Sequence, residues 1–169
     1  MKYSDIKLWD VINGEGVRVS IFVSGCNHHC KGCFNPETWD CNYGEKWTEE
    51  IENKIFDYID KYRITIRGIS VLGGDPTYDT NIEPLSKFFD RFKERFPDKT
   101  IWIWSGFTIE EIKKDKKMFN MIKKCDFLVD GKFIEELKDL ELKFRGSKNQ
   151  RIINVKKYLE LGEKYFDLF

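Results

Sequence analysis

Short apolar segments alternate with longer amphipathic ones along this chain of 169 residues. The short segments are rich in β-branched and aromatic residues, which is typical of buried strands. The predicted strands span residues 19–24, 69–72, 100–104, 127–129 and 152–155. Between them, apolar residues recur three or four positions apart, and this spacing predicts helices. The predicted helical stretches span residues 48–62, 82–96, 108–124 (as one helix or two) and 133–140, with Thr48 and Thr108 as candidate N-caps.

This alternation of strand and helix predicts right-handed βαβ units and a mostly parallel sheet. A closed barrel of eight such units needs about 250 residues, more than this chain has. The expected fold is therefore α/β, either an incomplete TIM-like barrel or an open sheet. We expect residues 1–155 to form a single domain and residues 156–169 to form a C-terminal helical tail. In either fold, ligands bind beyond the carboxyl ends of the strands.

Charge and hydropathy argue against a nucleic acid or a membrane as the main partner. The chain has 29 Lys+Arg against 29 Asp+Glu, whereas a phosphate backbone or an anionic membrane surface attracts an excess of basic residues. No apolar run approaches the ~20 residues that span a bilayer. The first ten residues include Asp5 and Asp10 and lack the apolar core of a secretory signal. These features predict a cytoplasmic protein, and its aromatic content of 15% excludes a disordered chain.

Three of the five cysteines form one cluster, Cys26-x-x-x-Cys30-x-x-Cys33, directly after the first predicted strand. Because cytosolic proteins rarely keep disulfides, this cluster favours metal ligation. A structural zinc site needs a fourth ligand, and His28 or His29 is available. Both histidines lie inside the Cys26–Cys30 spacer, however, so one short loop would have to fold back on itself to close the tetrahedron.

A [4Fe–4S] cluster fits the same spacing better. It is normally held by four thiolates, so three closely spaced cysteines leave one iron without a protein ligand. That open iron is a site where a substrate can bind. We therefore favour an iron–sulfur cluster and keep a non-catalytic, zinc-binding interaction module as the alternative.

The cysteine spacing after the first strand resembles that of the radical S-adenosylmethionine (SAM) enzymes. Further motifs follow in order, and together they resemble the family of proteins that activate anaerobic ribonucleoside-triphosphate reductase. These motifs are Asn13-Gly14-Glu15-Gly16-Val17-Arg18, Gly73-Gly74-Asp75-Pro76, Trp102-x-Trp104-x-Gly106, Val129–Phe133 and Arg145–Gln150. The resemblance covers residues 3–155 and implies the incomplete form of the barrel. The chain departs from the family at Glu15, where proline is common, and in residues 156–169.

The resemblance implies an enzyme that generates a glycyl radical. Cys26, Cys30 and Cys33 would bind three irons, and the amine and carboxylate of SAM would chelate the fourth. Reductive cleavage of SAM would yield a radical that takes a hydrogen atom from a glycine of the reductase. The implied partners are therefore the anaerobic reductase and an electron donor such as flavodoxin.

The resemblance also implies which residues surround SAM. They are Gly32, Cys33, Phe34, Gly73, Gly74, Asp75 and Ser105. Phe34 would lie beside the adenine, the glycine carbonyls near the methionyl ammonium with Asp75 as a further acceptor, and Ser105 near the ribose or carboxylate. Residue chemistry alone leaves plainer interpretations open: core packing for Phe34, a turn for the Gly-Gly-Asp-Pro segment and a strand-end cap for Ser105.

Other residues and functions remain open from the sequence. Cys41 and Cys125 are most simply an ordinary thiol and a small buried hydrophobe. Arg145 would contact the SAM carboxylate or the partner, and Asp130 lies in a segment that equally suits a solvated turn. The alternative activities are activation of another glycyl-radical enzyme and small-molecule radical SAM chemistry of the deazapurine type.

Overall fold

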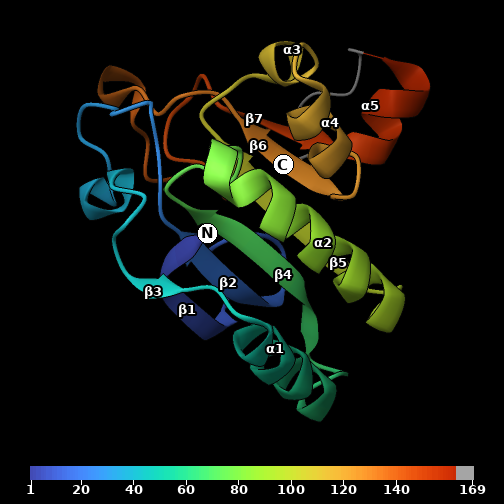
Figure 1. Cartoon of the computed structure of the whole chain (residues 1–169). Helices are drawn as coiled ribbons and strands as arrows, with labels where there is room; N and C mark the ends of the chain where they lie inside the picture. Colours follow the sequence, from blue (N-terminus) through green and yellow to red (C-terminus); the bar gives the residue numbers. More distant parts are fainter. Residues whose placement is uncertain (163–169) are drawn as a thin grey trace.

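In the computed structural model, which describes residues 1–162, a seven-stranded sheet has the order β3-β1-β2-β4-β5-β6-β7 (Figure 1). Its strands are β1 (Lys2–Asp10), β2 (Val17–Val23), β3 (Glu45–Lys46), β4 (Ile66–Gly73), β5 (Thr100–Ser105), β6 (Phe127–Asp130) and β7 (Arg151–Asn154). Strands β2, β4, β5 and β6 run parallel, whereas β1, β3 and β7 pair antiparallel with their neighbours. The α/β class is confirmed and the sheet is open. Its curvature into a partial barrel stays a prediction.

The helices follow the predicted amphipathic stretches. They are α1 (Glu49–Lys61), α2 (Asp79–Arg95), α3 (Ile109–Ile112), α4 (Lys116–Ile122) and α5 (Val155–Leu161). The Thr48 side chain caps α1, and Thr108 forms a capping box at α3. Residues 108–124 form two helices because Asp115 accepts hydrogen bonds from the next amides and starts a new helix, α4. Figure 1 shows α1, α2 and α4 on one face of the sheet.

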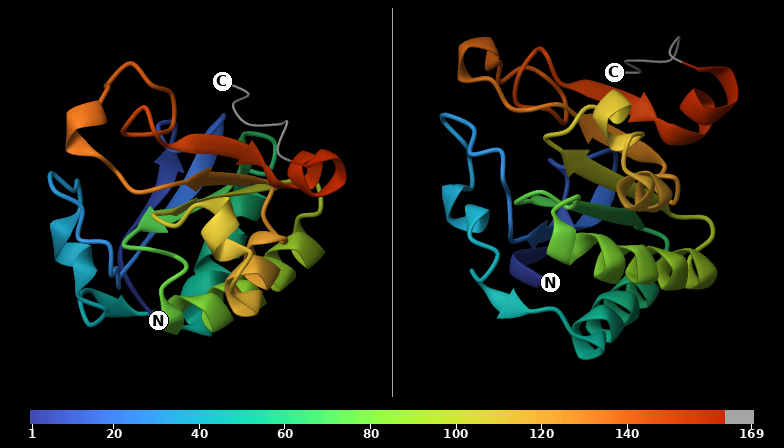
Figure 2. Two further views of the ribbon diagram at one scale, coloured as in Figure 1. Left: turned by 90° about the horizontal axis from the view of Figure 1, so that it is seen from above. Right: turned by 45° about the horizontal axis from the view of Figure 1, so that its top comes forward.

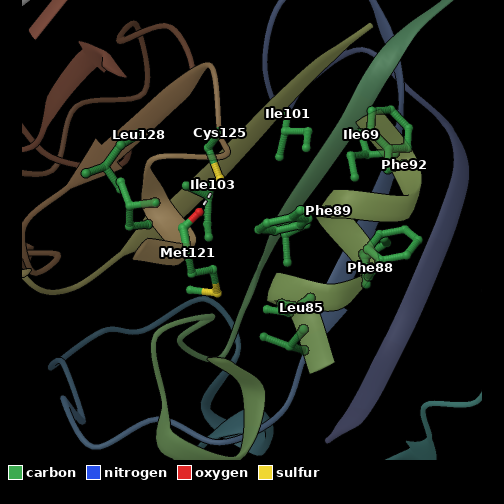
Figure 3. Close-up of a cluster of buried hydrophobic side chains, with 14 of the residues drawn as sticks. Ile69, Leu85, Phe88, Phe89, Phe92, Ile101, Ile103, Met121, Cys125 and Leu128 are labelled. Atoms are coloured by element: carbon green, nitrogen blue, oxygen red, sulfur yellow. Dashed lines mark hydrogen bonds between the residues drawn. The ribbon is translucent and has the colours of Figure 1, made fainter. Parts of the chain in front are cut away.

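Strand alternation divides the buried side chains between the two faces of the sheet. Ile101 and Ile103 of β5 belong to the larger core, together with Phe88, Phe89 and other residues of α2 (Figure 3). Each fully buried side chain of this size stabilises the fold by about 1.5–3 kcal/mol. Trp102 points to the opposite face, where it packs in a second cluster with Val129 and Ile152. The second face thus carries apolar side chains beside the buried Arg18 and Ser70, and Phe144 of the segment that follows β6 packs on it.

Several parts of the chain differ from the prediction, and two of them, β1 and residues 133–140, have a clear physical reason. Strand β1 was not predicted, because Tyr3 and Asp10 are its buried residues and the rest of this strand lacks an apolar face. The predicted helix over residues 133–140 is wrong: the chain there forms one 3₁₀ turn, Glu135–Leu137. This stretch instead pairs with residues 146–148, through hydrogen bonds from Asp139 N to Gly146 O and from Lys148 N to Leu137 O.

The C-terminal region is described as far as Gly162. Helix α5 begins at Val155, whose side chain is buried together with that of Tyr158. Residues 163–169 of the predicted tail lie outside the described residues, and the division of the chain at residue 155 stays a prediction. Across residues 1–162, no helix is long and apolar enough to cross a membrane.

Candidate functional site

The cysteine loop, residues 24–35, connects β2 to the 3₁₀ turn Pro36–Trp39. Its start is fixed by backbone hydrogen bonds from Gly25 N to Thr38 O (2.8 Å) and from Cys26 N to Trp39 O (3.2 Å). Gly25 has a φ of +99°, and a Cβ there would lie 2.6 Å from the Tyr78 ring. The loop therefore leaves the strand through a turn that glycine adopts without strain. Figure 2 shows this loop at the same end of the sheet as residues 131–150.

The three cysteines line one cavity of about 460 Å³ at the carboxyl ends of the parallel strands. All three are free and partly exposed. Burial raises the pKa of Cys26 to about 11 and also raises the pKa of Cys30. These two thiols therefore keep their protons at neutral pH until a metal displaces them.

The arrangement of the thiols fits a cluster better than a single ion. Among residues 1–162, no three His, Cys, Asp or Glu side chains are placed to hold one metal ion. A mononuclear zinc site needs four ligands that converge on one point. In an iron–sulfur cluster the thiolates bind different irons and stand apart around it. The three free thiols all line one cavity, as that second arrangement requires.

The histidines of the loop have other partners. His28 Nε2 lies 2.7 Å from Asp75 Oδ2, and the His28 ring packs edge-on against Phe107. His29 stacks on Trp39 with 4.7 Å between ring centroids. The zinc alternative needs one of these imidazoles as its fourth ligand, and the contact with Asp75 occupies one of the two ring nitrogens of His28.

The same cavity gathers most of the residues predicted to surround SAM. Besides the cysteines, its lining includes Phe34, Gly73, Gly74, Asp75 and Ser105. Gly32 is not part of the lining. It lies against Glu135, and a Cβ at Gly32 would be 2.7 Å from Glu135 Oε1. Phe34 is 57% exposed, so it is not part of the core, and its ring contacts Phe133.

Gly73 and Gly74 join the end of β4 to the cysteine loop. Gly74 N donates to Val23 O (2.7 Å) and Asp75 N donates to Gly25 O (2.8 Å). A Cβ at Gly74 would lie 2.7 Å from Gly25 O, too close for any side chain. These glycines are therefore required by the close approach of two backbones, whatever ligand they also contact.

Asp75 is fully engaged by protein donors. Its Oδ1 accepts from Thr77 N (2.8 Å) and Thr77 Oγ1 (2.6 Å), and its Oδ2 accepts from His28 Nε2 (2.7 Å) and Gly106 N (3.0 Å). Burial by itself would raise the Asp75 pKa, but the hydrogen bonds from His28 and Thr77 outweigh it and hold the pKa below its ordinary value. Asp75 is thus a buried carboxylate that links the ends of three strands, and its direct contact with SAM stays a prediction.

Ser105 and Asp130 also serve the ends of strands. Ser105 Oγ lies 2.9 Å from Thr77 Oγ1 and accepts from Phe107 N (3.1 Å), which is the bonding of a strand-end cap. Asp130 is fully buried, accepts from Ile109 N (2.7 Å) and pairs with Arg151. It lies outside the cavity lining, so Asp130 holds the end of β6 rather than forming a solvated turn.

Two loops contribute cavity residues that the sequence analysis did not assign. Ile12 and Asn13 come from the loop after β1, and Leu140 and Phe144 come from the long segment after β6. Arg145 lines the cavity as well and donates to Gln150 O (3.1 Å). The sequence motifs around Asn13 and Arg145 could have indicated that these loops belong to the site. Only the folded chain brings these residues to the same cavity as the cysteines.

The two remaining cysteines lie outside the cavity lining. Cys125 is buried in the core, and burial raises its pKa well above the ordinary value. It is therefore the small hydrophobe that was predicted. Cys41 is partly exposed beside Tyr78, which is compatible with an ordinary thiol.

Comparison with known proteins agrees with this geometry. A family model described as a 4Fe-4S single cluster domain matches residues 12–153. An anaerobic ribonucleoside-triphosphate reductase-activating protein of Vibrio cholerae is 43% identical over 152 residues, covering 90% of this chain and 97% of that protein. The protein of the same name from Haemophilus influenzae is 42% identical, covering 92% and 99%. That of Enterobacteria phage T4 is 39% identical, covering 90% and 93%.

Proposed function

Because the chain belongs to the family of anaerobic ribonucleoside-triphosphate reductase-activating proteins, we propose that it generates a glycyl radical on that reductase through reductive cleavage of SAM. The observation that carries this proposal is the placement of three free cysteine thiols around one cavity at the ends of the parallel strands. That is where α/β proteins bind their ligands.

Cys26, Cys30 and Cys33 would hold a [4Fe–4S] cluster through three of its irons, leaving the fourth to the amine and carboxylate of SAM. When bound, the cluster would supply the electron that cleaves a sulfonium C–S bond of SAM to methionine and a 5′-deoxyadenosyl radical, which would take a Cα hydrogen atom from a glycine of the reductase and become 5′-deoxyadenosine. The protein itself supplies position, orientation and exclusion of water.

The cavity walls suit SAM in their chemistry. Phe34 presents an exposed ring to the cavity, which an adenine can stack against. The strand end at Gly73 and Gly74 has no side chains, so a ligand can approach its backbone closely. Gly32 and Cys33 offer backbone close to Phe34. Asp75 and Ser105 act in this arrangement by holding the strand ends, and Arg145 is a cationic group within the cavity for a carboxylate.

The mouth of the cavity suits a protein substrate. Ile12 and Leu140 line it although they are 72% and 83% exposed. Large apolar side chains at the rim of a cavity are typical of a surface that a partner covers. A docked segment of the reductase would bury them and keep water away from the radical.

Reduction of the cluster requires an outside donor, for which we propose a flavodoxin in the cytoplasm. The first test is electron paramagnetic resonance (EPR) of anaerobically reconstituted, dithionite-reduced protein with and without SAM. A [4Fe–4S] signal that changes on addition of SAM is expected, and then a glycyl-radical signal when the anaerobic reductase is added.

Each failure in this test points to a different alternative. Bound zinc without sulfide, or a cluster that ignores SAM, would overturn the radical mechanism in favour of an interaction module. A SAM-responsive cluster that forms no radical on the reductase would retain the chemistry and reject the substrate, leaving another glycyl-radical enzyme or a small molecule.

A further inference from the structure

His28 lies midway between the first two cysteines of the cluster motif, lines the same cavity, and contacts Asp75 and Phe107 at the strand ends through its imidazole. We propose that His28 and Asp75 form a positioning pair that fixes the cysteine loop against the ends of β4 and β5, so that the thiols and the SAM-binding strand ends keep one relative placement. The inference rests on the proposed function of the site. Neither residue is required to touch the cluster or SAM.

A closely fitting slot holds the His28 side chain, which is 5% exposed. Its ring lies edge-on to Phe107, with 4.5 Å between ring centroids and an interplanar angle of 69°. A Cβ at Gly106 would lie 2.3 Å from the His28 ring, so a residue with any side chain at this position would displace the imidazole. The motif glycine at the end of β5 therefore makes room for this one histidine.

Asp75 is a rigid acceptor for the imidazole. Its Oδ2 is held by Gly106 N (3.0 Å), and its Oδ1 by the amide and hydroxyl of Thr77. With both oxygens fixed by donors from two loops, the carboxylate cannot turn without breaking several buried hydrogen bonds. The 2.7 Å contact with His28 Nε2 therefore defines where the imidazole lies.

The cysteine loop has few other ways to define its middle. Its backbone anchors lie at the start, on Gly25 and Cys26, and at the end, where Thr38 N donates to Asn35 O. Between them, Cys33 N donates to Cys30 O within the loop and the exposed His29 ring stacks on Trp39. Lys31 makes an ion pair with Glu135, but its side chain is 80% exposed, so this pair adds little stability in water. The buried His28 contact lies two residues from both Cys26 and Cys30. It therefore sets the position of both thiols.

The test compares His28→Ala with His29→Asn in anaerobically reconstituted protein. His29 is the adjacent histidine, stacks on Trp39 and has a φ of +48°, which asparagine tolerates. Residues that orient metal ligands typically change metal affinity by about 10–100-fold when they are replaced. We expect His28→Ala to lower iron bound per chain at limiting iron, and to raise the SAM concentration for the half-maximal EPR change by about tenfold. His29→Asn is expected to leave both values within about twofold of the wild type.

Two further variants separate positioning from a general loss of folding. His28→Gln retains an N–H donor toward Asp75 and is expected to restore part of the SAM response, whereas Asp75→Asn is expected to resemble His28→Ala. Thermal melting of each apoprotein shows whether the fold is retained, and SAM titrations are compared at equal iron content.

If folded His28→Ala binds iron and SAM like the wild type, the positioning role is wrong. If His28→Ala does not fold, the other two variants decide the question. Wild-type binding of iron and SAM by both His28→Gln and Asp75→Asn would then overturn the proposal. If the wild type itself shows no response to SAM, it is the proposed function that fails.

Discussion

The guanidinium of Arg18 donates from Nε to Ser70 Oγ at 2.7 Å, in the interior of the sheet between β2 and β4. Ser70 in turn donates its hydroxyl to Asn13 O, which fixes the loop that carries Ile12 and Asn13 into the cavity. Arg18 also donates to carbonyls of Glu15, Ile69 and Thr100 and to the Thr100 hydroxyl. All of these acceptors are neutral, and burial lowers the pKa of Arg18. The buried cation thus fastens three strands and one cavity loop together.

Replacement of Arg18 by methionine is expected to lower the free energy of unfolding by about 2–4 kcal/mol. The side chain keeps most of its length, but buried acceptors on β4 and β5 lose their donors. Urea unfolding of the apoprotein measures this loss. Arg67→Met, at an exposed position of β4, is the matched control and is expected to stay within about 0.5 kcal/mol of the wild type. Equal effects of the two substitutions would contradict the role of Arg18.

Alanine at Cys26, Cys30 or Cys33 is expected to lower iron bound per chain at least about tenfold, because each would remove one cluster ligand. Cys41→Ala is the control, since Cys41 lies outside the cavity lining, and its iron content is expected to match the wild type. Iron and sulfide analysis after reconstitution checks both statements. Loss of iron in Cys41→Ala would make Cys41 a fourth ligand and remove the open iron.

Phe34→Ala is expected to weaken SAM binding about three- to tenfold, with little change in stability. The ring is mostly exposed in the cavity, so it contributes to a stacked ligand by ~1 kcal/mol and little to the core. The SAM titration followed by EPR measures the change. Tyr43→Ala removes another exposed aromatic side chain, outside the cavity lining, and should leave the titration unaltered.

Aspartate at Ile12 or Leu140 is expected to raise the reductase concentration for half-maximal glycyl-radical formation about five- to tenfold. A charge at the apolar rim opposes docking of the partner but leaves the cysteines and their surroundings intact. SAM cleavage without reductase should therefore continue at the wild-type rate. Ile64→Asp, at a 94% exposed residue away from the cavity, is the control. Unchanged radical formation in both rim variants would place the docking surface elsewhere.

The ion pair between Glu110 and Arg151 predicts a pH-dependent contribution to stability. Its hydrogen bond with Arg151 lowers the pKa of Glu110 below the ordinary value of 4.5. A lowered folded pKa gives a stabilisation that is complete above the unfolded value and is lost as pH falls through the folded one. The Glu110 side chain is 43% exposed, so Glu110→Gln is expected to cost only about 0.5 kcal/mol at pH 7 and less at pH 4. Urea unfolding at both pH values checks this, with exposed Glu141→Gln as the control.

The sequence by itself determined those features that depend on local spacing. Apolar periodicity placed α1 and α2 and the central strands β4 and β5, and Thr48 and Thr108 marked helix starts that the structure confirms. The cysteine motif after β2 indicated the chemistry of the site, because thiolates a few residues apart can reach one cluster without any other part of the chain. In each case the residues that determine the feature lie close together in the sequence, within a single helix, strand or loop.

Only the tertiary structure decided which partners the polar residues have. Asp75 was expected to be a nearby acceptor for SAM, and the structure adds that its oxygens accept from His28, Thr77 and Gly106, from as far as 47 residues along the chain. Residues 133–140 were expected to form a helix, but they pair with residues 146–148 above the apolar face that carries Trp102. Strand β1 lacks an apolar pattern and forms because the backbones of β2 and β3 pair with it. Hydrogen bonds and packing between distant segments depend on how the sheet brings them together, and local spacing carries no information about that.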